Sequence, residues 1–221
     1  MKLTTHASSS KGNMFTLETE EHTILIDAGI KKDLSADILC VTHAHGDHVK
    51  YISHYIDNVD TIVTSEEVLN DIARVVDQYT YQKILSKFDH LPELNNIKII
   101  EMVHDVPCVG FLIEDSKNTY LHITDTVHVK YEPIFDKVTL ASVEANHDLE
   151  LLETSKISDY LKNRITTVGH LNNVQALGVC KWLPNAKINL IHLSEDRNAH
   201  ERIKALFSDI DYVIAGNIES E

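Results

Sequence analysis

One short segment of the chain gathers residue types that bind metal ions. The stretch THAHGDHV at 42–49 contains His43, His45, Asp47 and His48. Composition alone would give this arrangement roughly 0.004 times in a chain of this length, so chance does not explain it. Imidazole and carboxylate groups crowded in this way are typical of a transition-metal site. The segment therefore predicts a metal site. Surface or core histidines without chemical function would not be expected to cluster in this way.

The composition is that of an ordinary globular protein. The chain has 221 residues, of which 43% are hydrophobic and 24% charged, and this suffices for one domain over 1–221 with a full core. It has no apolar run long enough to span a membrane, and MKLTTHASSS at the start lacks the apolar stretch of a secretory signal. Cys40, Cys108 and Cys180 form no CxxC pair and predict reduced thiols. We therefore expect a cytoplasmic protein without a membrane partner.

The charge balance is strongly acidic. The formal net charge is −14, and the 20 lysines and arginines are scattered along the chain. Proteins that grip long nucleic acid by its phosphates usually carry a basic stripe, and none is visible here. Metal cations bound to acidic ligands would offset the negative charge locally. The balance thus weighs against an extended polyanion as partner, although a small anion at a metal site is compatible with it.

Strand and helix patterns alternate along the chain without repeats. We expect strands at 2–7, 37–43, 61–65, 96–103, 109–115, 118–126, 140–146, 187–194 and 211–216, and a hairpin over 14–29. We expect helices at 48–56, 65–76, 157–165, 172–183 and 198–207, with Ser65 as an N-cap ahead of two glutamates. No proline-rich or serine-rich linker divides the chain. The pattern predicts one α/β domain with early antiparallel strands.

Residues of the ligand types follow the predicted strands at their ends. In α/β sheets, functional groups gather where strands run out into loops. Six strands each end on or near a histidine or an aspartate, which suggests one shared cleft for Asp27, His43, His104, Asp125, His147 and His192. His170 follows Gly169 between two predicted helices. Several of the seven glycines lie beside these motifs, where the backbone needs positive φ or close approach.

These motifs, taken in order, resemble a known family. THAHGDH resembles the HxHxDH signature of the metallo-β-lactamase-fold hydrolases. The further segments narrow the resemblance to the WalJ (YycJ) group, which is related to the RNase Z-like phosphodiesterases: SSSKGN, LIDAG, VHDVPCVGF, ITDT, EANHD, RITTVGHLNN and IHLSEDRN. The resemblance spans residues 1 to about 200. The chain departs from the group in its shorter length, in lacking an evident RNase Z exosite arm, and in Asn172, where a serine often stands.

The resemblance implies an α/β fold, a four-layer αββα sandwich with two divalent metal ions, zinc or manganese, at one edge. The residues support the same arrangement independently. In extended chain, i and i+2 point the same way, so His43 and His45 can bind one ion. With His104 they would form a three-histidine site that leaves a position open, which is a catalytic pattern.

The second ion would be held beyond the turn at Gly46. Asp47 and His48 can begin a helix there and face that ion, and His192 would complete its ligands. Asp125 is expected to bridge the two ions. Asp27 is expected behind them, where it would orient a ligand histidine.

The implied chemistry is hydrolysis of a phosphodiester. Two ions about 3.5–4 Å apart would lower the pKa of a bridging water, so that hydroxide attacks phosphorus in line. His170 matches the position that protonates the leaving group in RNase Z-like enzymes, and histidine suits that role near neutral pH. His147 is expected to contact phosphate or a ligand. Glu144 would orient His170 or face solvent.

Three functions remain open on the sequence. The first is a nuclease that acts on DNA or RNA ends, as the resemblance to WalJ implies. The second is a phosphodiesterase for a small cyclic nucleotide, because the compact chain also resembles phage anti-Pycsar enzymes. The third, for which the motifs offer least support, is a hydrolase of a non-phosphate ester, lactam or thioester. The expected partner is a nucleotide or nucleic-acid phosphodiester, and the sequence leaves a homodimer open.

Overall fold

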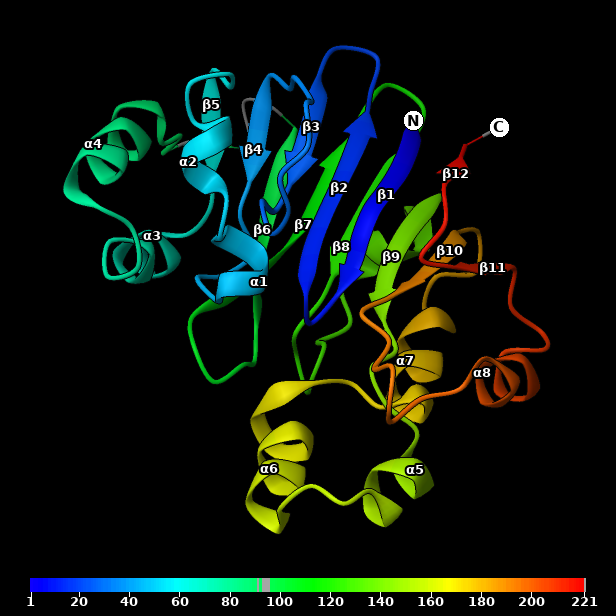
Figure 1. Cartoon of the computed structure of the whole chain (residues 1–221). Helices are drawn as coiled ribbons and strands as arrows, with labels where there is room; N and C mark the ends of the chain where they lie inside the picture. The colour runs from blue at the N-terminus through cyan, green and yellow to red at the C-terminus, as the bar shows by residue number, and fades with distance from the viewer. Residues whose placement is uncertain (91, 93–95, 221) are drawn as a thin grey trace.

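A computed structural model describes residues 1–90, 92 and 96–220. Within these residues the strands form two six-stranded sheets (Figure 1). The first has the order β12-β1-β2-β3-β4-β5, with β1 Lys2–Ser9, β2 Gly12–Glu18, β3 Thr23–Ile26, β4 Ile38–Cys40, β5 Thr61–Val63 and β12 Ile218–Glu219. The second has the order β11-β10-β9-β8-β7-β6, with β6 Ile97–Met102, β7 Cys108–Glu114, β8 Thr119–Ile123, β9 Leu140–Glu144, β10 Lys187–Ile191 and β11 Tyr212–Ile214.

The two sheets share one pattern of strand directions. In the first sheet β1, β2 and β3 are antiparallel neighbours, and β3, β4 and β5 are parallel. In the second, β6, β7 and β8 are antiparallel, and β8 to β11 are parallel. Parallel neighbours need crossover connections, and helices occupy most of them, although the connection from β3 to β4 contains none. The early antiparallel strands and the hairpin over 14–29 are confirmed.

Helices flank the paired sheets, and two further helices, α5 Leu149–Thr154 and α6 Asp159–Arg164, lie beyond the lower ends of the strands (Figure 1). The first sheet is accompanied by α1 Gly46–Val49, α2 Ile52–Tyr55, α3 Glu66–Ile72 and α4 Gln78–Lys87. The second is accompanied by α7 Asn173–Cys180 and α8 His200–Leu206. The order helix, sheet, sheet, helix confirms the predicted four-layer αββα sandwich.

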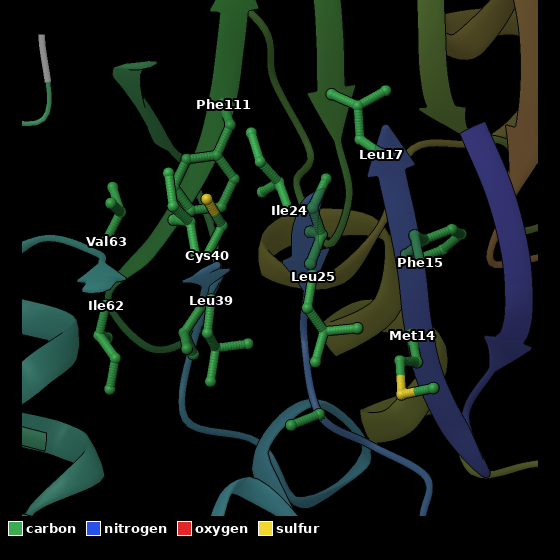
Figure 2. Close-up of a cluster of buried hydrophobic side chains, with 14 of the residues drawn as sticks. Met14, Phe15, Leu17, Ile24, Leu25, Leu39, Cys40, Ile62, Val63 and Phe111 are labelled. Carbon is green, nitrogen blue, oxygen red and sulfur yellow. The ribbon is translucent and has the colours of Figure 1, made fainter. Parts of the chain in front are cut away.

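An apolar layer joins the two sheets. Phe111 of β7 belongs to the same buried cluster as Leu39 and Cys40 of β4, and all three are fully buried (Figure 2). Burying a large apolar side chain of this kind contributes about 1.5–3 kcal/mol. Because every strand of the first sheet contributes to the cluster, the two sheets are held face to face and their ends are fixed relative to each other.

The predicted helix over 48–56 is two short helices instead. The N–H of Tyr51 donates to the Ala28 carbonyl (2.9 Å), and the Ala28 N–H donates to the His48 carbonyl (2.7 Å). These bonds to the loop after β3 replace the local helical bond of Tyr51, whose backbone leaves the helical region at ψ 20°. The chain thereby turns between α1 and α2. The helix is interrupted here because Tyr51 bonds to a loop that is distant along the chain. The local sequence does not show this contact.

Some helices begin where a capping residue in the sequence predicts them, and other elements have no clear sequence pattern. The hydroxyl of Ser65 accepts from the Val68 N–H (3.2 Å), so the predicted cap of α3 is confirmed. The helices α4 and α5 and the strand β12 were not predicted. In α4 only Thr80 and Ile84 are buried, so this helix shows no continuous apolar stripe in the sequence. Its Asp77 N-cap is the one local signal for it.

Close backbone packing at Gly29 gives a stability prediction. A Cβ at Gly29 would lie 1.8 Å from the Asp47 carbonyl oxygen and 2.5 Å from the Asn13 nitrogen. We expect Gly29→Ala to lower the free energy of unfolding by about 1–3 kcal/mol or more, because backbone must move. Urea unfolding measures this. The control is Gly178→Ala in α7, where a Cβ meets no atom within 4 Å. Equal midpoints for both variants would contradict the expected crowding.

Candidate metal centre

The ends of strands from both sheets meet at one edge of the molecule. Asp27 follows β3, His43 lies beyond β4, and Asp125 follows β8. The loops after β6 and β10 bring His104 and His192 to the same edge. In Figure 1 this edge lies near α1, at the lower end of the strands. The shared cleft expected from the sequence is therefore formed by segments that are distant along the chain.

Three of these residues have an uncommon backbone conformation. The φ angles of Asp27, Asp125 and His192 are 60°, 50° and 55°. Non-glycine residues rarely adopt this left-handed region, and observed exceptions cluster at functional sites. Each of the three directly follows, or nearly follows, the last residue of a strand. The left-handed turn redirects its side chain toward the other ligand types at the sheet edge.

The first donor group consists of three histidines. His43 Nε2 lies 3.1 Å from His45 Nδ1, and His104 Nε2 lies 3.3 Å from the same atom. The Nδ1–H of His104 donates to the Gly169 carbonyl (3.0 Å), which leaves its Nε2 free to bind. Three imidazole nitrogens that face one another at this distance suit a divalent ion, because three histidines with an open position are a recurring zinc arrangement.

The second donor group consists of Asp47, His48 and His192, whose ligand atoms lie within 4.8 Å of one another. His48 Nε2 is 3.5 Å and His192 Nε2 is 3.7 Å from Asp47 Oδ2. The Nε2 of His192 is buried and has no hydrogen-bond partner among the described residues. A buried nitrogen without a partner is unfavourable, and a cation at this point would satisfy it. The residues present therefore fit a metal ion.

Asp125 contacts the second donor group and reaches one member of the first, His43. Its Oδ2 is 3.3 Å from His48 Nε2, and its Oδ1 is 3.9 Å from His192 Nε2. It also forms a possible ligand set with His43 and His48. The side chain is almost fully buried.

Asp27 supports the centre from behind. The Nδ1–H of His48 donates to its Oδ2 (2.7 Å), and the N–H and hydroxyl of Thr42 donate to its Oδ1 (2.8 and 3.0 Å). The carboxylate is fully buried. This bond fixes the ring of His48 so that Nε2 points to the donor group, which is how a supporting carboxylate orients a ligand histidine.

Burial and charge separate the histidine pKa values. Burial, with the neighbouring His48, lowers the pKa of His43 well below its usual range. Burial also lowers the pKa of His48, but the carboxylates of Asp27 and Asp125 outweigh it and raise that pKa to about 10. The same balance raises the pKa of His192, where Asp125 acts most strongly against burial. Without a metal ion, these raised pKa values favour the protonated forms of His48 and His192.

His170 and Glu144 form a hydrogen-bonded pair beside the centre. The Nδ1–H of His170 donates to Glu144 Oε1 (2.6 Å), and the same oxygen lies 3.1 Å from His192 Nδ1. Burial lowers the pKa of His170, but Glu144 outweighs it and the pKa is raised overall. A π-type turn, Ile165–Gly169, leads into His170, and such turns are frequent at functional sites. Glu144 is fully buried and so does not face solvent.

His147 is placed differently from the others. It is fully buried, and neither ring nitrogen has a hydrogen-bond partner in the described part of the chain. Burial lowers its pKa to about 4. Its backbone pairs with Asn172 in an isolated bridge. The ring thus lies neutral beneath the surface next to His170 and Glu144.

Sequence reasoning missed three polar neighbours of the centre. Asn13 Nδ2 lies 2.9 Å from His48 Nε2 and 3.2 Å from Asp47 Oδ2. Asp105 Oδ1 lies 3.0 Å from His104 Nε2 and pairs with Arg164. Thr42 bonds to Asp27 as described above. Asn13 lies in the SSSKGN motif and Asp105 directly follows His104, so adjacency to a motif was the available signal.

The fold and the donor groups define a metallo-β-lactamase-fold protein suited to divalent metal ions. The chain is similar in structure to YhfI of Bacillus subtilis, with a TM-score of 0.69, 16% identity and 99% of each chain covered. It is also similar to the short form of human tRNase Z, with a TM-score of 0.63, 16% identity, and 88% of this chain and 93% of that chain covered. Zinc-bound PqqB of Methylobacterium extorquens has a TM-score of 0.69 at 10% identity, with 99% of this chain and 100% of that chain covered.

The sequence comparison leads to a particular group within that fold. The chain is 29% identical over 233 residues to exodeoxyribonuclease WalJ of Streptococcus pneumoniae, covering 88% of this chain and 82% of the relative. It is 27% identical over 228 residues to exodeoxyribonuclease YycJ of Bacillus anthracis, covering 92% of this chain and 86% of the relative. No protein-family model matches the chain. The resemblance to the WalJ and RNase Z-like branch is confirmed, and it indicates a metal-dependent hydrolase of the nuclease or phosphodiesterase type.

The described residues include no helix that is both long and apolar enough to cross a membrane.

Metal binding is expected to release protons at pH 7. His48, with a pKa of about 10, and His192, with a raised pKa, must lose their protons before their nitrogens can bind a cation. Metal affinity should therefore fall as the pH falls. Titration calorimetry in buffers of different ionisation enthalpy counts the protons. Asp27→Asn removes a carboxylate that raises the His48 pKa, and it should reduce the count. Identical heats in every buffer would argue against this charge arrangement.

Proposed function

We propose that the protein is a dinuclear metal-dependent phosphodiester hydrolase that acts on nucleic-acid ends. The observation that carries the proposal is the position of Asp125, whose carboxylate contacts His48 and His192 of the second donor group and lies within 4.8 Å of a ring nitrogen of His43 in the first. His43, His45 and His104 would hold one ion, and Asp47, His48 and His192 the other, with zinc and manganese as the candidate metals. The exodeoxyribonuclease relatives, WalJ and YycJ, support nucleic acid as the substrate class.

Neighbouring groups hold the proposed ligand side chains in the orientation that metal binding needs. Divalent ions at such a centre lower the pKa of coordinated water and neutralise charge on phosphoryl oxygens. Asp27 holds His48 in the tautomer that presents Nε2, and the Gly169 carbonyl does the same for His104. Asp47 is held by contact with Asn13 and its position at the start of α1. These fixed orientations matter because ligands that need no rearrangement lose little free energy on binding.

His170 is proposed as the group that protonates the leaving oxygen. Its Nδ1–H is engaged by Glu144 Oε1 (2.6 Å), so Nε2 is the nitrogen that remains for the substrate. Glu144 also raises the His170 pKa against burial, which favours the protonated ring. A histidine held in this state and orientation suits general acid catalysis. His147, buried and neutral beside it, is proposed to support the position of this pair.

A small cyclic nucleotide is the second candidate substrate. The net charge of −14 favours it, because phosphate contacts and counterion release dominate affinity for long nucleic acid. A cyclic nucleotide needs only the local charge of the metal centre. The two candidates agree that one or a few nucleotides are engaged at a time. They differ in whether a free nucleic-acid end is required.

A comparison of substrates tests the proposed function. We expect cutting of short single-stranded and double-stranded oligonucleotides with free ends at physiological salt, and none of a closed circular duplex. Product analysis by gel, with defined zinc or manganese, measures this. Cyclic mononucleotides form a separate arm, and hydrolysis of these alone would favour the second candidate. Efficient cutting of the closed circle without activity on free ends would overturn both.

His170→Ala tests the leaving-group role. We expect the variant to retain its metal and to lose about 10²–10⁴-fold in turnover, which is the usual contribution of a general acid. The loss should shrink for a diester with p-nitrophenolate as leaving group, because that group needs no proton. Steady-state kinetics and elemental analysis measure both properties. The exposed His200 provides the control variant, His200→Ala. An equal loss on both substrates would mean that His170 positions phosphate instead.

A further inference from the structure

A small polar cavity adjoins the proposed catalytic centre. It measures about 60 Å³, and His170 and His192 form one side of it. Ser10, Asn146, Ser194 and Arg197 line the rest, together with aliphatic side chains. Its lining, within the described part of the chain, contains no aspartate or glutamate. The chain as a whole has a net charge of −14. This cavity differs from that average because the described residues of its lining offer hydrogen-bond donors and an arginine but no carboxylate.

Arg197 supplies the guanidinium of this lining, and its donors are not all used. Its Nε is buried and has no hydrogen-bond partner in the described structure. A guanidinium carries five N–H donors in a rigid fork, which matches the oxygens of a phosphate or carboxylate. Leaving a buried donor without a partner is unfavourable. An anion in the cavity would supply the missing acceptor.

Backbone hydrogen bonds connect the segments that carry the cavity lining. The Ser194 N–H donates to the Asn146 carbonyl, and the Asp148 N–H donates to the Arg197 carbonyl, both at 2.8 Å. Lys11 pairs with Glu195 (2.8 Å), which joins the turn that carries Ser10 to the loop that carries Arg197. The same ion pair engages the carboxylate of Glu195 outside the cavity lining. A preformed site of this kind spends little free energy on ordering.

The size of the cavity decides what it can hold. Ligand pockets for whole small molecules typically measure about 300–1,000 Å³, so a nucleoside does not fit in about 60 Å³. A single phosphate group does fit, and it presents the oxygens that Arg197 and the serine hydroxyls can bind. We propose that this cavity binds a terminal phosphate of the substrate, next to the diester that is cut, and that Arg197 is the residue that recognises it.

This inference rests on the proposed function and makes it more specific. A cyclic mononucleotide carries one phosphate, which the metal centre would take, and it leaves the cavity unused. A nucleic-acid strand with a phosphorylated end carries a second phosphate beside the terminal diester. The substrate class that fills both sites is therefore a phosphorylated nucleic-acid end. Phosphate at the 5′ end and phosphate at the 3′ end share this chemistry and are separate arms of the test.

The first measurement is binding in the presence of a chelator, so that no turnover occurs. Fluorescence anisotropy compares one labelled oligonucleotide with a 5′-phosphate, with a 3′-phosphate, and with hydroxyl groups at both ends. We expect the wild-type protein to bind one phosphorylated form about 10- to 100-fold more tightly than the hydroxyl form, the scale of charge-assisted hydrogen bonds. Arg197→Gln should bring this ratio close to one. Arg197→Lys should retain part of it, because the charge remains without the fork.

The matched control is Arg202→Gln, which removes the same charge from a side chain that is 45% exposed and paired with Glu150. It should leave the ratio and the activity unchanged. With metal restored, kcat/KM on the same oligonucleotides should show the same preference. Equal binding of phosphorylated and hydroxyl ends by the wild-type protein would overturn the inference, as would a preference that survives Arg197→Gln. Loss of all diester hydrolysis with an intact binding preference would instead refute the proposed function alone.

Discussion

The buried carboxylate of Asp27 is the interaction on which the arrangement of the centre depends. It accepts hydrogen bonds from Thr42, just beyond β4, and from His48 in α1, so it ties the end of β3 to the segment after β4 and to α1. A fully buried carboxylate is tolerated only when it is well hydrogen-bonded or paired. Because His48 supplies the cationic partner in the metal-free state, the histidine stays oriented. The same bond would hold the ring in place when a metal ion replaces the proton on Nε2.

The second sheet provides the complementary half. Asp125 and His192 leave its strands in the left-handed region, at φ 50° and 55°, as Asp27 does in the first sheet. Each turn points a charged or imidazole side chain across the gap between the sheet edges. The apolar cluster that includes Phe111 and Leu39 fixes the two sheets face to face, so the strained turns meet at a constant distance. Packing far from the centre thus maintains its geometry.

Charge explains how an acidic chain can present an anion site. At the centre, the carboxylates are matched by histidines whose pKa values they raise, and divalent cations would add positive charge there. Beside it, the lining that includes Arg197 and Ser194 contains no acidic side chain among the described residues. The overall charge of −14 therefore says little about the local potential that a phosphate would meet. It bears on long polyanions, which need contacts over a wide surface.

The sequence by itself determined an α/β domain with early antiparallel strands, most of the strands, and the set of ligand-type residues at strand ends, whereas the four-layer arrangement was implied by the family resemblance. Those features depend on local periodicity and on the i, i+2 spacing of His43 and His45, both of which are visible in the letters. Where the sequence-based prediction was wrong or incomplete, the structure depends on contacts between residues that are distant along the chain. The Tyr51 amide bonds to Ala28 and divides the expected helix, and α4 has too few buried residues to show a stripe. Tertiary structure alone decided which ring nitrogens of His48 and His104 are held by hydrogen bonds, and that Arg197 lies at the cavity. Each of these is set by hydrogen bonds and packing between segments that only folding brings together.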